Sequence, residues 1–470
     1  MSTGLTLFEK IWNAHVVTDL GGGMQLLHVD RHYLLDLGGS RYLAENAAIN
    51  ATVRNPELTF ATADHLVSTE PGRTGGRDVG ANEALATFRR ETKKHAIRLF
   101  DVNDAGQGIV HVVGPEQGLT LPGTLIACAD SHTCTNGALG AVAFGMGGSE
   151  LKHILATQTI IQRRPKTLRV RFNGTLGPCV GAKDMALALI GQVGVSAGTG
   201  YAVEYVGEAV NALSAEERMT LCNLSVEFGA RIGLVAPDEN VFDYLRGRPY
   251  APKGDDWNAA LAQWRELKSD DGARFDKEVA VDIDSLAPQI TWGVSPEEVI
   301  PVDGDVPEES PALTPEQRAA MKKALAYMGL EAGQRLAGTR VDRVFIGSCT
   351  NARLPDLRAA AAIARGRKVS PQVKAWVVPG SQQVKREAER EGLDQVFLSA
   401  GFEWREPGCS MCVAANGDVV EPGARCISTA NRNFVGRQGP GARTHIASPM
   451  VAAAAAIAGE IADPRRMLLA

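Results

Sequence analysis

Short apolar runs alternate with helix-like segments along the last third of the chain. Residues 341–346 and 373–378 are strand-length runs rich in β-branched side chains, and each is followed by a turn of small residues. Residues 354–365 and 384–391 then carry apolar side chains at helical spacing. Strands that alternate with helices predict a parallel sheet covered by helices. Because ligands bind such sheets in the loops that follow the strands, the loop that holds Cys349 is a candidate site.

The length of 470 residues predicts about three domains. Two segments have the composition of linkers: residues 162–166 are basic and contain a proline, and residues 301–315 are rich in proline and acidic residues. We therefore expect α/β domains formed by residues 1–165, 166–305 and 306–470.

Charge and hydropathy narrow the class of function. The chain carries 49 Lys and Arg against 54 Asp and Glu, a net charge of −5, which gives no support for a nucleic-acid or anionic-membrane surface. The first residues lack the basic and apolar regions of a signal peptide. The Ala-rich run at residues 451–459 is far shorter than the roughly 20 residues that span a bilayer. We expect a cytoplasmic protein without a nucleic-acid or membrane partner, in which an anionic substrate needs a local basic pocket.

Cysteines are grouped in this chain, which suggests metal ligation or reactivity rather than disulfides. Cys409 and Cys412 have the spacing of a chelating turn, and Cys349 lies between small residues in Gly-Ser-Cys-Thr-Asn. Three thiolates would hold three irons of a cubane cluster and leave the fourth open as a Lewis acid for a substrate hydroxyl. The alternatives are a metal-free turn and a zinc site, although no histidine lies within twenty residues of the pair. Spacing alone leaves the iron–sulfur interpretation about as well supported as all the alternatives together.

Two short motifs place a carboxylate beside an imidazole. They are Asp64-His65 and Asp130-Ser131-His132, the second in a Gly-rich setting. A carboxylate that holds one imidazole nitrogen fixes the tautomer and raises the pKa of the ring, which suits proton delivery. Each motif alone is also compatible with a structural histidine in the core.

Other polar candidates stand alone in the sequence. His111 and Glu227 lie in apolar stretches, where a single polar residue is more often a satisfied core group. Arg432 and Arg437 lie on either side of a glycine-containing turn and could clamp a carboxylate with two hydrogen bonds each. An exposed basic turn has the same composition.

Taken together, these segments resemble the aconitase superfamily, most closely its two-subunit members that dehydrate isopropylmalate. The resemblance covers nearly the whole chain. The motifs that carry it lie at residues 6–10, 61–65, 108–111, 114–123, 130–133, 219–223, 347–351, 407–412, 431–434 and 444–445. Many motifs in one order are far more specific than any of them alone.

The resemblance implies a role for each candidate residue. The implied ligands of a [4Fe–4S] cluster are Cys349, Cys409 and Cys412. The implied proton-transfer groups around the substrate hydroxyl and water are Asp64, His65, His111, Asp130, His132 and Glu227, with the Asp64-His65 pair protonating the departing hydroxyl. The implied contacts to substrate and cluster are Ser131, Asn223, Arg432 and Arg437. The implied fold has three α/β domains, with parallel or mixed sheets, around the cluster.

Family members also have a fourth, mobile domain that brings a serine base and an arginine, and this sequence shows no counterpart of it. In two-subunit members that swivel domain is a separate small protein. The resemblance therefore implies a heteromer with a small subunit. Its implied activity is that of a hydro-lyase that isomerises a small hydroxy-diacid, 2-isopropylmalate, to 3-isopropylmalate by dehydration and rehydration in leucine biosynthesis.

The sequence departs from the family at a few positions. Residues 35–40 replace the usual His-Glu-Val-Thr-Ser-Pro near the substrate pocket, Ala129 replaces a glycine, and Asn136 stands where histidine or tyrosine is common. These changes leave open a related hydratase of another diacid, such as citraconate, maleate, dimethylmaleate or homoaconitate. An RNA-binding cluster sensor is a third alternative, which the acidic balance and the missing fourth domain disfavour.

Overall fold

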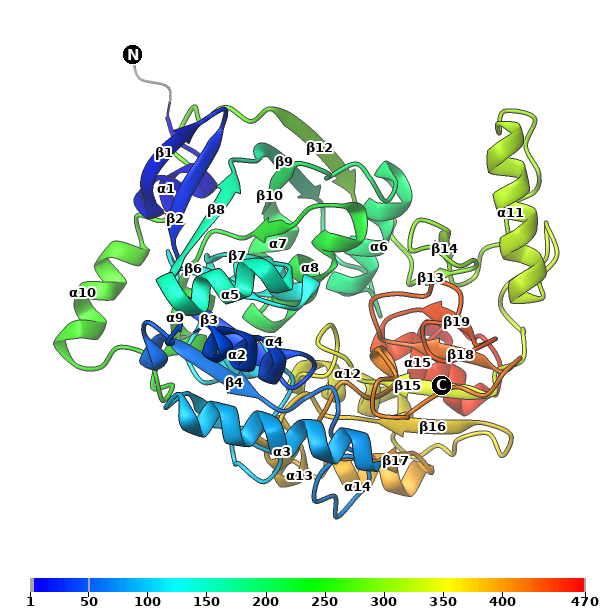
Figure 1. The fold of residues 1–470 in the computed structure, drawn as a ribbon. Coiled ribbons are helices and arrows are strands. Elements are labelled where there is room, and N and C mark those ends of the chain that lie inside the picture. The colour runs from blue at the N-terminus through cyan, green and yellow to red at the C-terminus, as the bar shows by residue number, and fades with distance from the viewer. Residues whose placement is uncertain (1–3, 50, 469–470) are drawn as a thin grey trace. The chain divides into compact units, whose positions relative to one another are not determined.

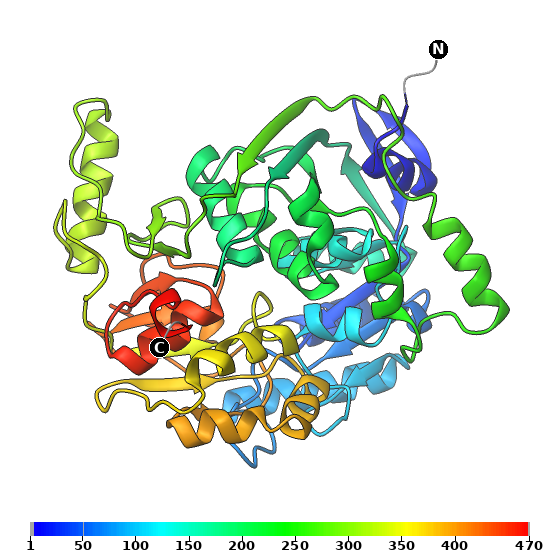
Figure 2. The same ribbon diagram turned by 180° about the vertical axis from the view of Figure 1, so that it is seen from behind.

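The computed structural model describes residues 4–49 and 51–468, and the chain divides into two compact units. Unit 1 consists of Met1–Val67, Thr74–Gly174 and Ser196–Val281. Unit 2 consists of Ser68–Arg73, Thr175–Val195 and Asp282–Ala470. Figures 1 and 2 show the elements of both units from opposite sides. The division into three domains after residues 165 and 305 stays a prediction.

The largest sheet of unit 1 has five parallel strands in the order β5-β4-β3-β6-β7. The strands are β3 (Arg31–Leu35), β4 (Thr59–Thr62), β5 (Arg98–Phe100), β6 (Leu125–Cys128) and β7 (Val142–Gly145). β4 and β6 are buried along their whole length, as a parallel strand covered on both faces requires. The chain leaves β3 toward one edge and later returns to its other side, so the strand order reverses between β3 and β6. Open α/β sheets bind ligands at the carboxyl ends of strands at such a reversal.

Two smaller sheets complete unit 1. One has the order β11-β10-β9-β12 and is formed by β9 (Lys166–Asn173), β10 (Tyr201–Val206), β11 (Ile232–Leu234) and β12 (Lys277–Asp282). The other is antiparallel, in the order β1-β2-β8, and is formed by β1 (Val16–Gly21), β2 (Met24–His28) and β8 (Thr159–Arg163). The α-helices of this unit are α1 (Leu7–His15), α2 (Gly39–Ala48), α3 (Val79–Lys94), α4 (Val110–Glu116), α5 (Gly148–Thr157), α7 (Glu208–Ala212), α8 (Ala215–Asn223), α9 (Glu239–Leu245) and α10 (Asp255–Trp264). Short 3-10 helices are η1 (Pro56–Leu58), η2 (Ser131–Leu139) and η3 (Leu224–Phe228).

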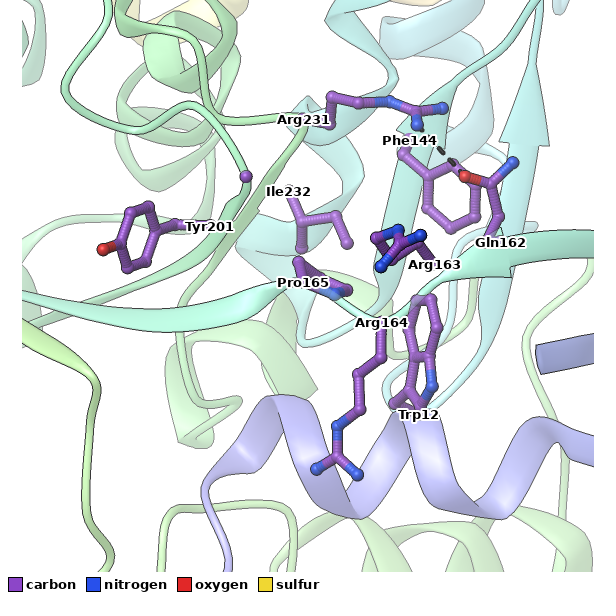
Figure 3. A pocket seen from close by; sticks show the side chains of 10 residues that line it. Trp12, Phe144, Gln162, Arg163, Arg164, Pro165, Tyr201, Arg231 and Ile232 are labelled. Atoms are coloured by element: carbon purple, nitrogen blue, oxygen red, sulfur yellow. Dashed lines mark hydrogen bonds between the residues drawn. The ribbon is translucent and has the colours of Figure 1, made fainter. Parts of the chain in front are cut away.

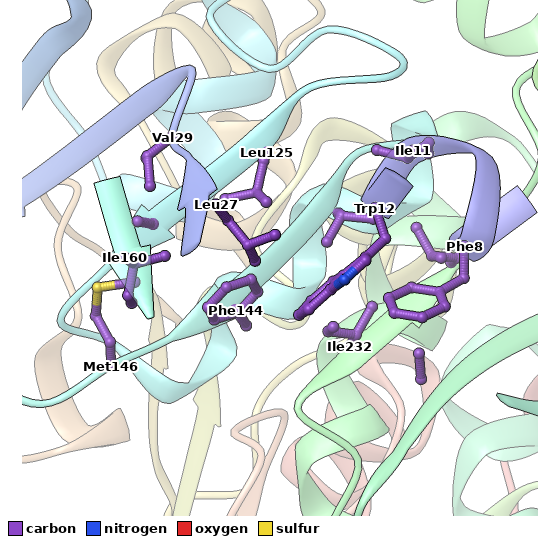
Figure 4. Packing of buried hydrophobic residues seen from close by; sticks show 14 of the residues in the cluster. Phe8, Ile11, Trp12, Leu27, Val29, Leu125, Phe144, Met146, Ile160 and Ile232 are labelled. Carbon is purple, nitrogen blue, oxygen red and sulfur yellow. The ribbon is translucent and has the colours of Figure 1, made fainter. Parts of the chain in front are cut away.

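Helix α1 shows how local sequence starts an element and packs it. Thr6 and Glu9 form a capping box, in which each side chain accepts a hydrogen bond from the backbone N–H of the other residue. On the apolar face of the helix, Phe8 and Trp12 pack in a core cluster that also contains Phe144 of β7 (Figure 4). Both α1 aromatic residues are at most 2% exposed, so this end of unit 1 is firmly packed.

Unit 2 is built on a second sheet of five parallel strands, in the order β17-β16-β15-β18-β19. The strands are β15 (Arg343–Ile346), β16 (Lys374–Val377), β17 (Glu403–Trp404), β18 (Arg425–Ser428) and β19 (Arg443–Ile446). A short antiparallel pair is formed by β13 (Gln289–Thr291) and β14 (Val299–Pro301). In the five-stranded sheet the strand order reverses between β15 and β18, which repeats the topology of the large sheet in unit 1.

Helices cover the sheet of unit 2. They are α6 (Ala182–Val193), α11 (Pro315–Met328), α12 (Leu354–Ala364), α13 (Gln382–Arg390), α14 (Leu393–Ala400), α15 (Pro449–Ala458) and α16 (Arg465–Leu468), with the 3-10 turn η4 (Ser410–Cys412). Figure 2 shows α12 in yellow and α13 and α14 in orange lying side by side. The Ala-rich helix α15 packs against α12 and β15 with its small side chains buried.

The alternation predicted for the last third is confirmed. The two predicted strands correspond to β15 and β16, the two predicted helices to α12 and α13, and the sheet is parallel. The α/β class is therefore confirmed as well. Among the described residues, no helix is both long and apolar enough to cross a bilayer.

Candidate active site

Three carboxylates follow strands of the large sheet in unit 1, two of them buried and that of Asp130 partly exposed. Asp36 comes directly after β3, Asp64 follows β4, and Asp130 follows β6. Because the carboxyl ends of parallel strands meet at one edge, the fold brings these residues to the place where the strand order reverses. Candidates that are up to about a hundred residues apart in sequence therefore share one location.

Asp64 and His65 form a close, buried pair. His65 Nδ1 lies 2.7 Å from Asp64 Oδ1, and Asp64 Oδ2 accepts a hydrogen bond from the Val110 N–H at 2.9 Å. Burial lowers the pKa of His65, but the charge and hydrogen bond of Asp64 outweigh burial and raise that pKa to about 10. The ring therefore carries a proton on each nitrogen at neutral pH.

Asp130 joins three histidines. Its Oδ1 lies 3.3 Å from both His111 Nε2 and His132 Nδ1, and its Oδ2 lies 3.7 Å from His65 Nε2. Burial raises the pKa of Asp130, while hydrogen bonds from His111 and His132 reverse that effect and hold it well below the ordinary value. Ser131 extends the group, since its Oγ lies 3.4 Å from His132 Nδ1.

Glu227 completes the cluster on the far side of His132. Its Oε1 lies 2.8 Å from His132 Nε2, so both ring nitrogens of His132 face a carboxylate. Burial lowers the pKa of His132, but Asp130 and Glu227 raise it to about 9. His111 and Glu227, which looked like isolated core residues in the sequence, thus belong to the same network as the two acid–histidine motifs.

Asn136, one of the departures from the family pattern, contacts His111. Its Oδ1 accepts from Thr120 Oγ1 at 2.6 Å and its Nδ2 donates to the Thr133 carbonyl at 2.9 Å, which fixes the orientation of the amide. The same Nδ2 lies 3.5 Å from His111 Nδ1. This contact makes Nδ1 the acceptor and leaves the Nε2 proton of His111 to face Asp130.

Asn223 lies next to η2 and contacts it through a hydrogen bond. It is fully buried at the end of α8, and its Nδ2 donates to Thr135 Oγ1 at 2.8 Å. The contact of Asn223 with substrate stays a prediction.

Asp36 is a member of the cluster that the sequence analysis did not single out. It is 1% exposed, and its two oxygens accept from the backbone N–H groups of His65 and Leu66 at 3.0 and 2.9 Å. Its Oδ1 also lies 3.9 Å from His65 Nδ1. Burial and the neighbouring Asp64 raise the pKa of Asp36 to about 6. The available signal was a lone carboxylate directly after two leucines, inside the segment that departs from the family.

In unit 2, the same kind of strand end carries the cysteines. Cys349 follows β15, and Asn431 follows β18 across the reversal in strand order. The Asn431 side chain bridges two thiols, with Nδ2 3.5 Å from Cys349 Sγ and Oδ1 3.7 Å from Cys412 Sγ. Ser348 also reaches both, since its Oγ lies 4.0 Å from Cys349 Sγ and 3.2 Å from Cys412 Sγ.

Strained backbone holds these cysteines in place. Ser348 and Ser410, the neighbours of Cys349 and Cys409, have φ of +81° and +49°, a region that side chains other than glycine rarely adopt. Such a residue costs on the order of 1–3 kcal/mol and persists only where its surroundings enforce it. The buried carboxylate of Asp418 does so for Ser410, because its Oδ2 accepts from Ser410 Oγ at 2.7 Å.

The donor set fits an iron–sulfur cluster. All eight cysteines are free thiols, and Cys349, Cys409 and Cys412 are 6 to 7% exposed on two neighbouring turns. His445, a buried histidine of this unit, is engaged at both ring nitrogens, by the Thr291 carbonyl at 2.6 Å and by Arg425 at 2.7 Å. That ring therefore does not complete a zinc site with the cysteine pair, which removes part of the case for the zinc alternative.

Arg432 and Arg437 lie on the turn after β18 and are partly exposed. The guanidinium of Arg437 lies 5.5 Å from the ring centre of Phe434, which is itself 51% exposed. Both arginines thus belong to unit 2 with the cysteines, whereas the histidine–carboxylate cluster belongs to unit 1.

Lys183 on α6 is a second buried group that the sequence analysis missed. It is 1% exposed, and its Nζ donates to the carbonyls of Thr429 and Ala430, directly before Asn431, at 2.5 and 2.7 Å. Burial lowers the pKa of Lys183 to about 7, against the attraction of Asp356 and of the thiols of Cys412 and Cys349. The adjacent charges of Lys183 and Asp184 in a stretch otherwise made of Ala, Met and Leu were the signal in the sequence.

Comparisons with known proteins agree with this geometry. Residues 9–459 match the Aconitase family (aconitate hydratase). A protein named 3-isopropylmalate dehydratase large subunit 1, from Bradyrhizobium diazoefficiens, is 62% identical over 464 residues, which are 99% of this chain and 97% of that protein. The holo form of aconitase X from Thermococcus kodakaraensis aligns with 87% of this chain and 84% of its own, at a TM-score of 0.47 and 14% identity, values too low to bear on the assignment. On the family match and the high identity to a full-length relative, the chain belongs to the aconitase family of hydro-lyases.

Proposed function

We propose that this chain is the large subunit of a hydro-lyase that converts 2-isopropylmalate to 3-isopropylmalate by dehydration and rehydration, a step of leucine biosynthesis. The observation that carries the proposal is the 62% identity, over 99% of the chain, to a protein of that name. The two groups of side chains described above supply the kinds of chemistry that such a reaction needs.

His65 is the proposed acid for the departing hydroxyl. Hydroxide is a poor leaving group, so a proton must reach it as the C–O bond breaks. Asp64 occupies Nδ1, which leaves the proton on Nε2 as the transferable one. With its pKa raised to about 10, the ring is charged at neutral pH and serves as an acid rather than a base.

His111, His132 and their carboxylates are the proposed groups that hold and orient the hydroxyl and the water. Asp130 keeps the Nε2 proton of His111 and the Nδ1 proton of His132 directed at itself, and Glu227 faces the other nitrogen of His132. Rehydration at the neighbouring carbon uses the same groups in reverse. Ser131 and Asn223 are the proposed substrate contacts on this side, and Arg432 and Arg437 the proposed partners of a substrate carboxylate.

Cys349, Cys409 and Cys412 are the proposed ligands of a [4Fe–4S] cluster. Three protein thiolates leave one iron of a cubane without a protein ligand, and when bound the cluster would supply a Lewis acid for the substrate hydroxyl. Within the chain, Asn431 and Ser348 orient two of the three sulfurs.

We further infer a small-subunit partner. The relative at 62% identity is named a large subunit, and the family resemblance places the base for the carbon-bound proton on a separate swivel domain. We assign that base to the small subunit. We also propose a cytoplasmic location, and the acidic balance of the chain gives no support for a nucleic-acid or anionic-membrane partner.

A second candidate function is the hydration of another small diacid. The observation that favours it is the segment at residues 35–40, where only Asp36 and Ser40 are polar and the Asp36 carboxylate is already engaged by backbone N–H groups. The segment therefore offers fewer hydrogen bonds than the usual family sequence.

Kinetics of the reconstituted enzyme test both candidates. The large and small subunits are combined anaerobically, and kcat/KM is compared for 2-isopropylmalate, citraconate, maleate and cis-homoaconitate. We expect 2-isopropylmalate to be preferred. Preference for a diacid without the isopropyl group by more than about a hundredfold, beyond what a few methylene groups provide, would overturn the substrate and keep the hydro-lyase assignment.

A further inference from the structure

A cavity of about 230 Å³ opens in unit 1 beside helix α1 (Figure 3). Its lining comes from α1, from the ends of β7 and β8, and from the starts of β10 and β11. Among the described residues that line it, none belongs to the histidine–carboxylate cluster. The cavity is therefore a feature that the proposed reaction does not use.

The floor of the cavity is apolar and rigid. Trp12, Phe144 and Ile232 form it, and each is at most 4% exposed within the core cluster of Figure 4. The Trp12 Nε1 is already committed, because it donates to Gln25 Oε1 at 2.7 Å. The floor thus offers van der Waals contact to a ligand and asks for no hydrogen bond. Since it belongs to the packed core, it exists before any ligand arrives.

Arginines stand at the rim. Arg231 donates to Gln162 Oε1 at 3.1 Å and to the Gly145 carbonyl at 2.7 Å, both of which are neutral oxygens. The guanidinium of Arg163 ends in the middle of the ring of lining side chains in Figure 3, and both arginines are exposed. Two guanidinium groups above an apolar floor favour an anion with an apolar body.

Arg164 makes a useful contrast. Its guanidinium points away from the centre of the cavity in Figure 3 and forms an ion pair with Glu9 Oε1 at 2.8 Å. Its charge is therefore balanced by Glu9 of helix α1, and the positive charge available at the cavity comes from Arg163 and Arg231. We expect a ligand to bind with its acid group at these two arginines and its body on the floor.

We propose that this cavity is a second ligand site, which binds a small carboxylic acid with an aromatic or branched apolar body. A volume of about 230 Å³ lies below the roughly 300–1,000 Å³ of pockets that take drug-sized ligands, which suits a small acid. Arg163 and Arg231 hold the carboxylate, and Phe144, Trp12 and Ile232 contact the body. The proposal does not depend on the proposed reaction, because the binding needs neither cluster nor small subunit.

Benzoate and benzamide provide a matched pair of probes, since they differ in charge and not in shape. Saturation-transfer NMR and calorimetry are performed on the full chain, at two salt concentrations. We expect benzoate to bind at least tenfold more tightly than benzamide, because a hydrogen bond to a charged group is worth more than its neutral counterpart. The preference should shrink at the higher salt concentration.

Two variants locate the site. Arg163→Met and Arg231→Met together should weaken benzoate binding at least tenfold and leave benzamide unchanged, while Arg54→Met, an exposed arginine outside the cavity, should leave both unchanged. Circular dichroism and thermal unfolding of all three proteins check that the fold is retained. Equal affinity for the two probes, or equal loss of benzoate binding in Arg54→Met and in the double variant, would overturn the proposal. Displacement of benzoate by 2-isopropylmalate from the double variant as effectively as from the unchanged chain would place the probe at the catalytic cluster and overturn it as well.

Discussion

Replacing Asp64 by asparagine tests whether catalysis needs the positive charge of His65 or only the position of its ring. Burial lowers the pKa of His65, and the charge and hydrogen bond of Asp64 are the largest contributions that raise it from 6.5 to about 10. That difference corresponds to about 5 kcal/mol in favour of the protonated ring, at 1.36 kcal/mol per pKa unit. Asparagine keeps the size of the side chain and an acceptor for the ring but removes the charge. The pKa of His65 then falls toward its ordinary value, although the charges of Asp36 and Asp130 still raise it.

The expected result is a large loss of turnover with a changed pH profile. At pH 7.5 the reconstituted variant should lose about 10²–10⁴-fold in turnover, the usual contribution of a general acid. The unchanged enzyme should keep the protonated form of His65 up to about pH 10, whereas the activity of the variant should decline from a lower pH because the pKa of its His65 is lower. Initial rates of 3-isopropylmalate formation between pH 5.5 and 9.5, measured at equal iron content, check both points.

The control is Asp30→Asn. Asp30 is paired with His15 at 2.5 Å in the same unit, so the change removes the same kind of acid–histidine pair outside the cluster. Its turnover should stay near that of the unchanged enzyme. An Asp64→Asn enzyme with near-normal turnover and a flat profile through pH 6 to 8, or an Asp30→Asn enzyme with an equal loss, would show that His65 is a structural histidine.

Four further predictions follow from the same contacts. Serine at Cys349, Cys409 or Cys412 should abolish the brown absorbance of anaerobically prepared protein, while Cys179→Ser should keep it. Iron analysis and absorption spectra measure this, and the opposite pattern refutes the ligand assignment. Asp36→Asn should lower kcat about tenfold at unchanged iron content, because the His65 and Leu66 N–H groups lose a charged acceptor worth roughly 1.5–3 kcal/mol; unchanged kcat contradicts this. Lys183→Met should leave two buried carbonyls without their donor, at about 1–3 kcal/mol each, and lower both thermal stability and iron retention, with Lys183→Arg restoring part of each. The free energy of unfolding should fall as pH rises from 6.5 toward 10, since the raised pKa values of His65 and His132 stabilise the folded state fully below 6.5 and lose that effect through about 9 to 10. The lowered pKa of Lys183, about 7, acts in the opposite direction over the same range and makes the fall smaller. Denaturant titrations at pH 6.5, 8 and 9.5 measure the change.

Local patterns predicted the parts of the site that are local in sequence. Asp64 and His65 are neighbours in the chain, and the structure pairs them directly. The loop after residues 341–346 was a candidate because a strand end in a parallel sheet faces ligands, and Cys349 does follow β15. The residue roles themselves came from the resemblance to the family and stay predictions.

Contacts between distant segments could not be derived from pattern. His111 and Glu227 each look like core residues, and only the folded chain brings them to Asp130 and His132. Asp36 is important because its carboxylate reaches two N–H groups some 30 residues away, which depends on β3 and β4 being neighbours. Lys183 is similar, since periodicity describes the face of a helix and not the carbonyls that a buried ammonium will meet.

The discontinuous make-up of unit 2 has a consequence for protein synthesis. Lys183 and its acceptor Thr429 are separated by 246 positions, and Thr69 and its partner Asp418 by 349. At about 5–20 residues per second, helix α6 emerges from the ribosome roughly 5–20 s before the β13–β14 pair that it contacts and roughly 12–50 s before Thr429. During that interval its Ala, Met and Leu face, buried in the finished protein, is open to other apolar surfaces in the cell. Production of this chain should therefore depend on chaperones that bind nascent polypeptides, and any truncation before β13 should leave α6 as a site of aggregation.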